Sequence, residues 1–173
     1  MQITRVRTVP VWGRRRRPFG AVTRTALGPA AISDYTIVFV DTDEGITGIG
    51  EVCSVFKRRG ALLRSDIDHA LAPAMKGEDP RRIAHLVRKL DQTLDGVEEA
   101  KAGIEMALWD ILGKALNVPV YTLLGGKVRD RIPLSYSIPF GTPEQMATFA
   151  VERVKAGHRT IKVKVGSEDG RRD

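Results

Sequence analysis

Two lysines separated by one residue are the part of this sequence best suited to chemistry. They are Lys162 and Lys164, in a short β-branched run at residues 160–165. Successive side chains of a strand point to opposite faces, so both lysines would lie on one face and Ile161 on the other. Two neighbouring ammonium groups repel, which helps one of them lose its proton and act as a base near neutral pH. A solvated strand face would show the same spacing, so the surrounding sequence has to decide.

The composition is that of a folded globular chain. Its 173 residues are 42% apolar, which is enough for a sizeable core. No apolar run has the length of a membrane span, and the first residues lack the apolar centre of a signal peptide. We therefore expect no membrane partner and a cytoplasmic location. The single cysteine, Cys53, excludes an internal disulfide and a multi-cysteine zinc site.

The net charge of +7 raises the question of a nucleic-acid partner. The densest basic stretch is the four arginines at 14–17, which lie between two predicted strands and before Pro18 and Gly20, as in an exposed loop. No helix-turn-helix, zinc finger or aromatic RNA-binding pattern accompanies them. We expect no nucleic-acid partner, and the loop is either simply solvated or meets an anionic substrate.

The first 130 residues are predicted to form an α+β domain. Strands at 2–11, 33–41 and 46–51 would form a three-stranded antiparallel sheet, with a turn at 41–45. The apolar period then becomes helical. One helix begins near Leu62 and stops at Pro73, a second covers 81–94, and a third covers 98–116 with unbroken i, i+3, i+4 apolar spacing.

The charged residues of the third predicted helix, and the glycines in it and after it, are expected to have structural roles. Lys101 with Glu105, and Asp110 with Lys114, are spaced four residues apart for surface ion pairs. Gly113 and the glycines at 125–126 are expected to allow close packing and a tight turn, because they lack the pattern of a phosphate-binding loop.

Residues 131–173 show a different order of elements. A strand at 132–138, a helix that begins at Thr142 and Pro143 and ends at Lys155, and a strand at 160–165 form a βαβ unit. Both strands are apolar enough to be buried on two sides, as in the opening of a (β/α) barrel. A complete barrel needs about 250 residues. We expect a domain at 1–130 followed by the first βαβ of a truncated barrel at 131–173.

The order of these motifs resembles a known family. Residues 102–115 followed by 118–126 resemble the signature of the mandelate racemase and muconate lactonizing enzyme family, within the enolase superfamily. Residues 41–51 look like its amino-terminal hairpin, 71–80 like its helix-to-helix connection, and 162–164 like its second-strand K-x-K. The resemblance implies an amino-terminal capping domain followed by a (β/α) barrel.

The resemblance also implies a reaction. Such enzymes abstract the proton α to a substrate carboxylate, and bound Mg²⁺ stabilises the enediolate. Carried over by position, Lys164 is the base, and Lys162 favours its deprotonation and is placed to contact the carboxylate. Ser137, at the end of the first barrel strand, would touch substrate, although a hydroxyl there is often structural. Phe19, in a loop at 12–29 that resembles the family's mobile cap, would shape specificity.

The metal site is expected to lie outside this chain. In the family, the metal-binding carboxylates and the opposing acid or base come from later barrel strands, which would follow Asp173. No residue of the chain is therefore assigned as a metal ligand, and its three histidines lack the spacing of a metal site.

Several functions stay open at this point. We expect part of a Mg²⁺-dependent racemase, epimerase or cycloisomerase acting on a small carboxylate. The alternatives are a dehydratase of the same superfamily, or a catalytically inactive truncated protein that acts as an interaction module. We also expect a homo-oligomer, because a partial barrel leaves apolar strand faces and edges uncovered.

Overall fold

The computed structural model describes residues 1–14, 23–25, 28–30, 32–53, 60–139 and 141–165. It contains two compact units, a larger one formed mainly by Met1–Arg14 and Ile32–Lys127, and a smaller one that includes the residues from Val128 onward. No helix in the described ranges combines the length and apolarity needed to cross a membrane.

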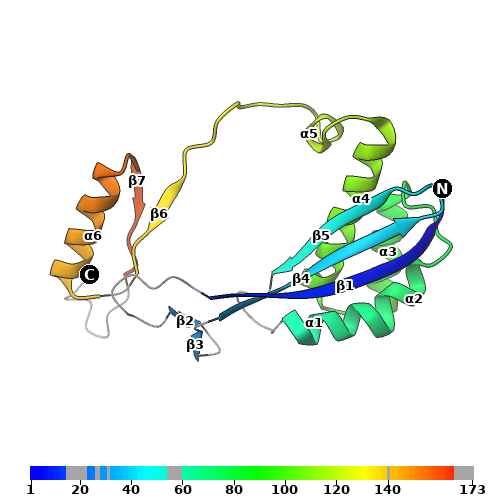
Figure 1. Ribbon diagram of the computed structural model, residues 1–173, viewed down its shortest axis with the longest axis horizontal. Coiled ribbons are helices and arrows are strands. Elements are labelled where there is room, and N and C mark those ends of the chain that lie inside the picture. Colours follow the sequence, from blue (N-terminus) through cyan, green and yellow to red (C-terminus); the bar gives the residue numbers. More distant parts are fainter. Residues whose placement is uncertain (15–22, 26–27, 31, 54–59, 140, 166–173) are drawn as a thin grey trace. The chain divides into compact units, whose positions relative to one another are not determined.

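The larger unit is a three-stranded antiparallel sheet covered by helices (Figure 1). Its sheet is three-stranded and antiparallel, as predicted, and has the order β1-β4-β5. Its main elements are β1 (Ile3–Arg14), β4 (Ile32–Thr42), β5 (Thr47–Cys53), α1 (Gly60–Asp66), α2 (Ala72–Met75), α3 (Ile83–Thr93), α4 (Glu98–Leu116) and α5 (Val120–Leu123). Strands β2 (Thr23–Thr25) and β3 (Gly28–Ala30) form a separate two-stranded ladder.

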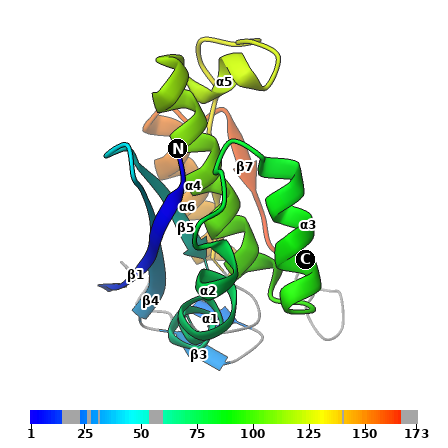
Figure 2. The same cartoon turned by 90° about the vertical axis from the view of Figure 1, so that its right-hand side faces the viewer.

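The core lies between one face of the sheet and the helices (Figure 2). Alternate residues of the central strand β4 are buried there, and Val38 and Val40 have no exposed surface. They pack with the apolar stripe of α4, including Ile104, Leu108 and Ile111. The predicted helix at 98–116 is confirmed with the same bounds, because its unbroken apolar period fits a helix that is buried along its length.

Strand β5 and helix α4 approach each other at backbone distance. A Cβ atom at Gly50 would overlap the carbonyl oxygen of Gly103, and one at Gly48 would overlap the carbonyl oxygen of Ala107. On the helix side, a Cβ at Gly103 would lie 2.7 Å from Cγ2 of Val52. Only glycine fits at these positions, so the sequence Gly-x-Gly in β5 sets how closely the helix and the sheet pack.

The predicted stop of the first helix at Pro73 is wrong. The helix continues from α1 through a π-helical turn at Ile67–Leu71 into α2, which ends at Met75. In that turn the N–H of Ala72 bonds to the carbonyl of Ile67, five residues earlier. Pro73 lies directly after this turn, inside the continuous helix, where it has no N–H to give to the helical ladder. The turn also buries Ile67 and Leu71, so core packing holds the helix through the proline.

The edge of β5 is covered by side chains of α4. The backbone N–H of Ile49 donates to Oδ2 of Asp110 at 2.8 Å, and Lys114 Nζ donates to the Thr47 carbonyl at 2.7 Å. Asp110 and Lys114 also form the predicted ion pair, at 2.7 Å. The edge strand therefore has fewer free backbone groups for pairing with another chain.

The predicted pairing of Lys101 with Glu105 is wrong. Lys101 instead forms an ion pair with Asp91 on α3, at 2.8 Å, while Glu105 accepts a hydrogen bond from the Trp109 indole at 3.3 Å. Contact between α3 and α4 offers Lys101 a carboxylate on another helix, which sequence spacing along one helix could not reveal.

Gly113, near the end of α4, and the glycines at 125–126 after it form the expected close contact and turn. Gly125 and Gly126 both have φ of +104°, and the Gly126 N–H bonds to the Tyr121 carbonyl at 2.8 Å. A Cβ at Gly113 would lie 2.9 Å from the Val118 carbonyl oxygen. These glycines therefore allow a tight turn and close packing, as predicted.

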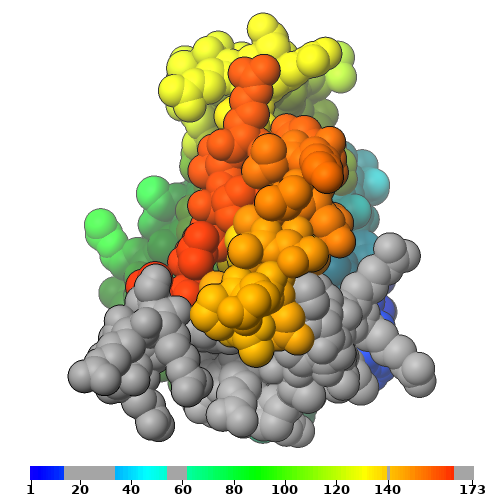
Figure 3. Space-filling model, turned by 90° about the vertical axis from the view of Figure 1, so that its left-hand side faces the viewer, coloured from blue at the N-terminus to red at the C-terminus, as the bar shows by residue number. Residues whose placement is uncertain are grey.

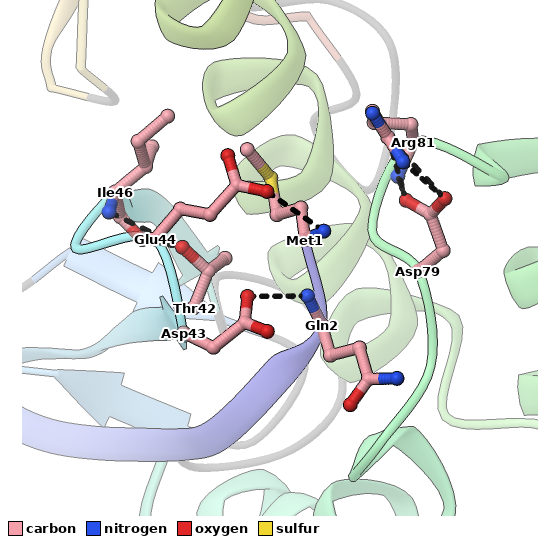
Figure 4. A network of polar contacts seen from close by, with 8 residues as sticks. All are labelled: Met1, Gln2, Thr42, Asp43, Glu44, Ile46, Asp79 and Arg81. Atoms are coloured by element: carbon pink, nitrogen blue, oxygen red, sulfur yellow. Dashed lines mark hydrogen bonds and ion pairs between the residues drawn. The ribbon is translucent and has the colours of Figure 1, made fainter.

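Polar contacts join the start of the chain to the β4–β5 hairpin (Figure 4). The Met1 ammonium lies 2.8 Å from Oε1 of Glu44, and the Gln2 N–H donates to Oδ1 of Asp43 at 2.6 Å. The hydrogen bond to Glu44 raises the pKa of the Met1 ammonium. This end of β1 is also tied on its other side, where Ile3 exchanges backbone hydrogen bonds of 2.8 Å with Gly77 and Glu78.

Asp79 and Arg81 form a compact ion pair next to this network. Arg81 Nη2 lies 2.8 Å from Oδ2 of Asp79, and the Arg81 backbone N–H also donates to that carboxylate, at 3.0 Å. The side-chain and backbone hydrogen bonds from Arg81 lower the pKa of Asp79 to about 2.

We expect Gly50→Ala to lower the free energy of unfolding by about 2 kcal/mol or more, because the new methyl group must push apart two backbones. Gly13→Ala is the matched control, since a Cβ there would meet nothing within 4 Å. Urea unfolding followed by circular dichroism measures both. Equal stability of the two variants would contradict the role of the close contact.

We expect Asp79→Asn to flatten the acid dependence of stability. A carboxylate with a lowered folded pKa stabilises the fold above its unfolded pKa, near 4, and that contribution is lost as pH falls toward about 2. As the pH is lowered from about 5 to about 2, the unfolding temperature should therefore fall less steeply for Asp79→Asn than for the parent chain. The control is Asp95→Asn in an exposed turn. An unchanged slope in the Asp79 variant would contradict the assignment.

Candidate functional site

The predicted lysine strand is part of a two-stranded parallel ladder in the smaller unit. Strand β6 (Ser135–Ser137) pairs with β7 (Thr160–Lys162), and the register sets Ser137 beside Lys162. The ladder closes with the Ile138 N–H bonded to the Lys162 carbonyl at 2.9 Å. The structure therefore brings two of the predicted site residues together.

Both strands are shorter than predicted. The expected strands at 132–138 and 160–165 are replaced by three-residue strands, and Ile132 and Leu134, before β6, are each 74% exposed. A barrel strand is paired on both sides and buried on both faces. Within the described chain β6 and β7 pair only with each other. Each strand therefore extends only as far as its pairing with the other.

Helix α6 (Pro143–Lys155) crosses between the two strands and is confirmed with its predicted start and end. Thr142 and Gln145 form a capping box, in which each side chain bonds to the other residue's backbone N–H, at 3.3 and 3.0 Å. Figure 3 shows α6 beside β7 on one face of this unit. The helix therefore divides the strand side chains into those that face α6 and those that face away from it.

An aromatic cluster attaches α6 to the ladder. Tyr136 packs edge-on against Phe149, with ring centroids 5.6 Å apart, and against His158, at 5.0 Å. The Arg153 guanidinium lies over both the Tyr136 and Phe149 rings, 5.3 and 4.9 Å from their centroids. We did not predict this cluster from the sequence, although Phe149 and Arg153 are four residues apart on one helix.

The cluster determines which face of the ladder is open. Tyr136 and Ile161 are half-buried on the helix side, whereas Ser135, Ser137 and Lys162 are exposed. Because strand side chains alternate, these exposed residues lie on the face away from α6. The open face thus carries two hydroxyls and an ammonium, groups that can hydrogen-bond to an anionic ligand.

Lys164 lies two residues beyond the end of β7, and its side chain is half-buried. The prediction that a regular strand carries both lysines is wrong at this point, because the ladder ends at the pair Ser137 and Lys162. The role of Lys164 as a base stays a prediction. Phe19, the other predicted substrate contact, lies outside the described residues.

The residues in the described ranges do not fit a magnesium site. Among them no three His, Cys, Asp or Glu side chains come close enough to hold a metal ion together. Mg²⁺ needs oxygen ligands in near-octahedral geometry. No step of a reaction can therefore be assigned to a metal held by these residues.

Comparison with known proteins identifies the family. The model of the mandelate racemase / muconate lactonizing enzyme amino-terminal domain matches residues 3–125, which is most of the chain. The chain belongs to this family.

Relatives of the chain are isomerases and lyases. It is 38% identical to the N-succinyl-L-Arg/Lys racemase of Bacillus cereus over 134 residues, covering 76% of this chain and 36% of the racemase. It is 32% identical to the L-Ala-D/L-Glu epimerase of Bacillus subtilis, covering 98% of this chain and 46% of the epimerase. The solved 2-chloromuconate cycloisomerase of Rhodococcus opacus 1CP superposes with a TM-score of 0.87 at 30% identity, covering 97% of this chain and 46% of that one. The chain thus spans less than half the length of these relatives.

We expect Phe149→Ala to destabilise the smaller unit and to leave the larger unit unchanged. Removing a buried ring typically costs about 3–5 kcal/mol, and Phe149 is only 7% exposed. Hydrogen exchange followed by mass spectrometry should then show faster exchange in β6 and β7 but not in α4. Val151→Ala, on the exposed face of the same helix, is the control. Protection of β6 and β7 equal to that of the parent chain would contradict the anchoring role of the cluster.

Proposed function

We propose that this chain is the amino-terminal part of an enzyme that removes the proton α to a carboxylate in a small substrate. Lys164 is the base, and Lys162 favours its deprotonation and binds the substrate carboxylate. The observation that carries the proposal is the open face of the β6-β7 ladder, where Ser137 and Lys162 are paired and exposed. Family membership supports it, since the matched relatives include a racemase, an epimerase, a cycloisomerase and a dehydratase.

The proposed domain order follows from the same comparison. Residues 1–130 form the capping domain, and residues 131–173 begin a (β/α) barrel that would supply further strands beside β6 and β7. The exposure of Val163 and Val165, 54% and 65%, supports this, because such residues are usually buried in a barrel. Active sites of barrels lie at the carboxyl ends of the strands, which is where Ser137 and Lys162 stand.

Racemisation or epimerisation is the reaction we favour. Inverting a carbon next to a carboxylate requires that its proton leave and return, and a base at the end of a strand can remove it. The epimerase of Bacillus subtilis matches this chain over 98% of its length, whereas the racemase and the 39% identical cis-3-hydroxy-L-proline dehydratase of Roseibium aggregatum match it over 76% and 79%. Cycloisomerisation and dehydration begin with the same proton removal and are the alternatives.

We propose Mg²⁺ as the cofactor of the whole enzyme. A solved enolase-superfamily member from Roseovarius nubinhibens ISM, 36% identical with a TM-score of 0.86, is complexed with magnesium. When bound, such an ion would stabilise the negative charge that develops on the carboxylate. Because the described ranges hold no group of three His, Cys, Asp or Glu side chains able to bind an ion together, its ligands would have to come from elsewhere in the enzyme.

The proposal is tested by α-proton exchange in the full-length enzyme that contains this segment. N-succinyl amino acids and dipeptides in D₂O, followed by proton NMR, should lose their α-proton signal with the parent protein. Lys164→Arg keeps the charge but removes the base, so exchange should fall by at least about a thousandfold. Lys155→Arg on exposed α6 is the control and should leave exchange unchanged.

Two outcomes would count against this function. Full exchange in Lys164→Arg would exclude Lys164 as the base. Absence of exchange with every carboxylate by the parent protein, when it is folded and supplied with Mg²⁺, would favour the interaction-module alternative.

A further inference from the structure

Helix α3 exposes a row of basic side chains on the larger unit. The helix packs against α4, which lies between it and the sheet (Figure 2). Its apolar side faces the core, where Leu86 and Leu90 have no exposed surface. Arg82, His85 and Arg88 are exposed, and their spacing of three residues sets them along one side of the helix. We call the surface formed by these three residues the basic face of α3.

The two arginines of the basic face have no carboxylate partner. Among the described residues, neither Arg82 nor Arg88 forms an ion pair. The two carboxylates that precede α3 are each paired with another cation: Glu78 with Lys89 at 2.6 Å and Asp79 with Arg81 at 2.8 Å. The guanidinium groups of the basic face are therefore available to an anionic group from outside the larger unit.

The electrostatic field around α3 favours negative charge. Residues 76–89 contain five lysines and arginines against two carboxylates, a net charge of +3 with the histidine neutral. The pKa of Glu78 is lowered, first by the hydrogen bond from Lys89 and also by the charges of His85 and Arg82. Two residues of the basic face thus help to stabilise the ionised form of a carboxylate that belongs to this chain, and a carboxylate of another molecule would meet the same field.

We propose that the basic face of α3 binds an acidic segment of another protein. Arg82 and Arg88 are six residues apart, which corresponds to about 9 Å along the helix. Carboxylates two residues apart lie on one side of an extended segment, about 7 Å from each other. Flexible arginine side chains span that difference, so each guanidinium can form two parallel hydrogen bonds with one carboxylate.

Nucleic acids and membranes fit the basic face less well. Affinity for nucleic acid grows with the number of phosphates neutralised, and two arginines about 9 Å apart reach few of them. Single-strand binding also uses aromatic side chains that stack on bases, and α3 contains no Phe, Tyr or Trp. Helices that bind membrane surfaces expose an apolar side, whereas Ile83, Leu86 and Leu90 of α3 are buried in the core. A short acidic protein segment requires neither feature.

Fluorescence anisotropy of a labelled peptide of eight glutamates, titrated with the full 173-residue chain at low ionic strength, tests the proposal. The parent chain should bind the peptide, and added salt should weaken binding because the contact joins exposed charges. The double variant Arg82→Gln/Arg88→Gln should bind at least about tenfold more weakly, since two charge-assisted contacts are lost. Arg88→Gln alone leaves the start of α3 unchanged and should bind about threefold more weakly.

Matched controls separate the basic face from the positive charge of the whole chain. Arg129→Gln/Arg131→Gln removes the same charge from an exposed segment after α5 and should leave binding nearly unchanged. Replacing the four arginines at 14–17 by glutamine tests the densest basic stretch of the sequence. A peptide of eight glutamines, a single-stranded DNA octamer and vesicles containing phosphatidylserine are the comparison probes. Circular dichroism and urea unfolding check that each variant is folded.

The proposal is wrong if the parent chain does not bind the glutamate peptide, or if the folded Arg82/Arg88 double variant binds it like the parent. It is also wrong if the variant at 14–17 loses binding while the double variant keeps it. Tighter binding of the DNA or the vesicles through the same two arginines would replace the acidic segment by that partner. None of these outcomes depends on catalysis, so they leave the proposed function to its own test.

Discussion

The larger unit depends on the close approach of β5 to α4. Glycines at 48, 50 and 103 remove the side chains that would separate the strand from the helix, so their backbones touch. This distance lets Val38 and Val52 reach the helix and be fully buried. Close packing of this kind gains many dispersion contacts, but it leaves no room for an added methyl group. The position of α4, and with it the core, is therefore fixed by residues that contribute almost no side-chain surface of their own.

The same contact brings charged groups of α4 to the edge of the sheet. Asp110 and Lys114 can bond to the backbone of β5 only because the helix lies so close to it. At the opposite edge, the loop at 77–78 bonds to the first residue of β1. Both edges are thus partly covered, which limits their pairing with another chain.

In the smaller unit, polar residues are oriented on a very short ladder. Two strands of three residues have little stability of their own. The rings of Tyr136, Phe149 and His158, with Arg153 over two of them, hold the ladder against α6. Because one face is held in this way, Ser137 and Lys162 are left on the other. The orientation of the candidate site is therefore decided by residues that lie on the opposite face from it.

The sequence by itself determined the elements whose signals are local. Helix 98–116, the helix start at Thr142 and Pro143, the hairpin turn at 41–45 and the family were all predicted, because periodicity, capping chemistry and motif order are visible along the chain. The tertiary structure alone decided the passage of the helix through Pro73, the pairing of Lys101 with Asp91, and the end of β7 at Lys162. Each of these depends on a neighbour that is distant in the sequence: a buried core, a second helix, or a partner strand that stops. Local preference predicts an element, but packing and pairing with distant residues decide where it ends and what it contacts.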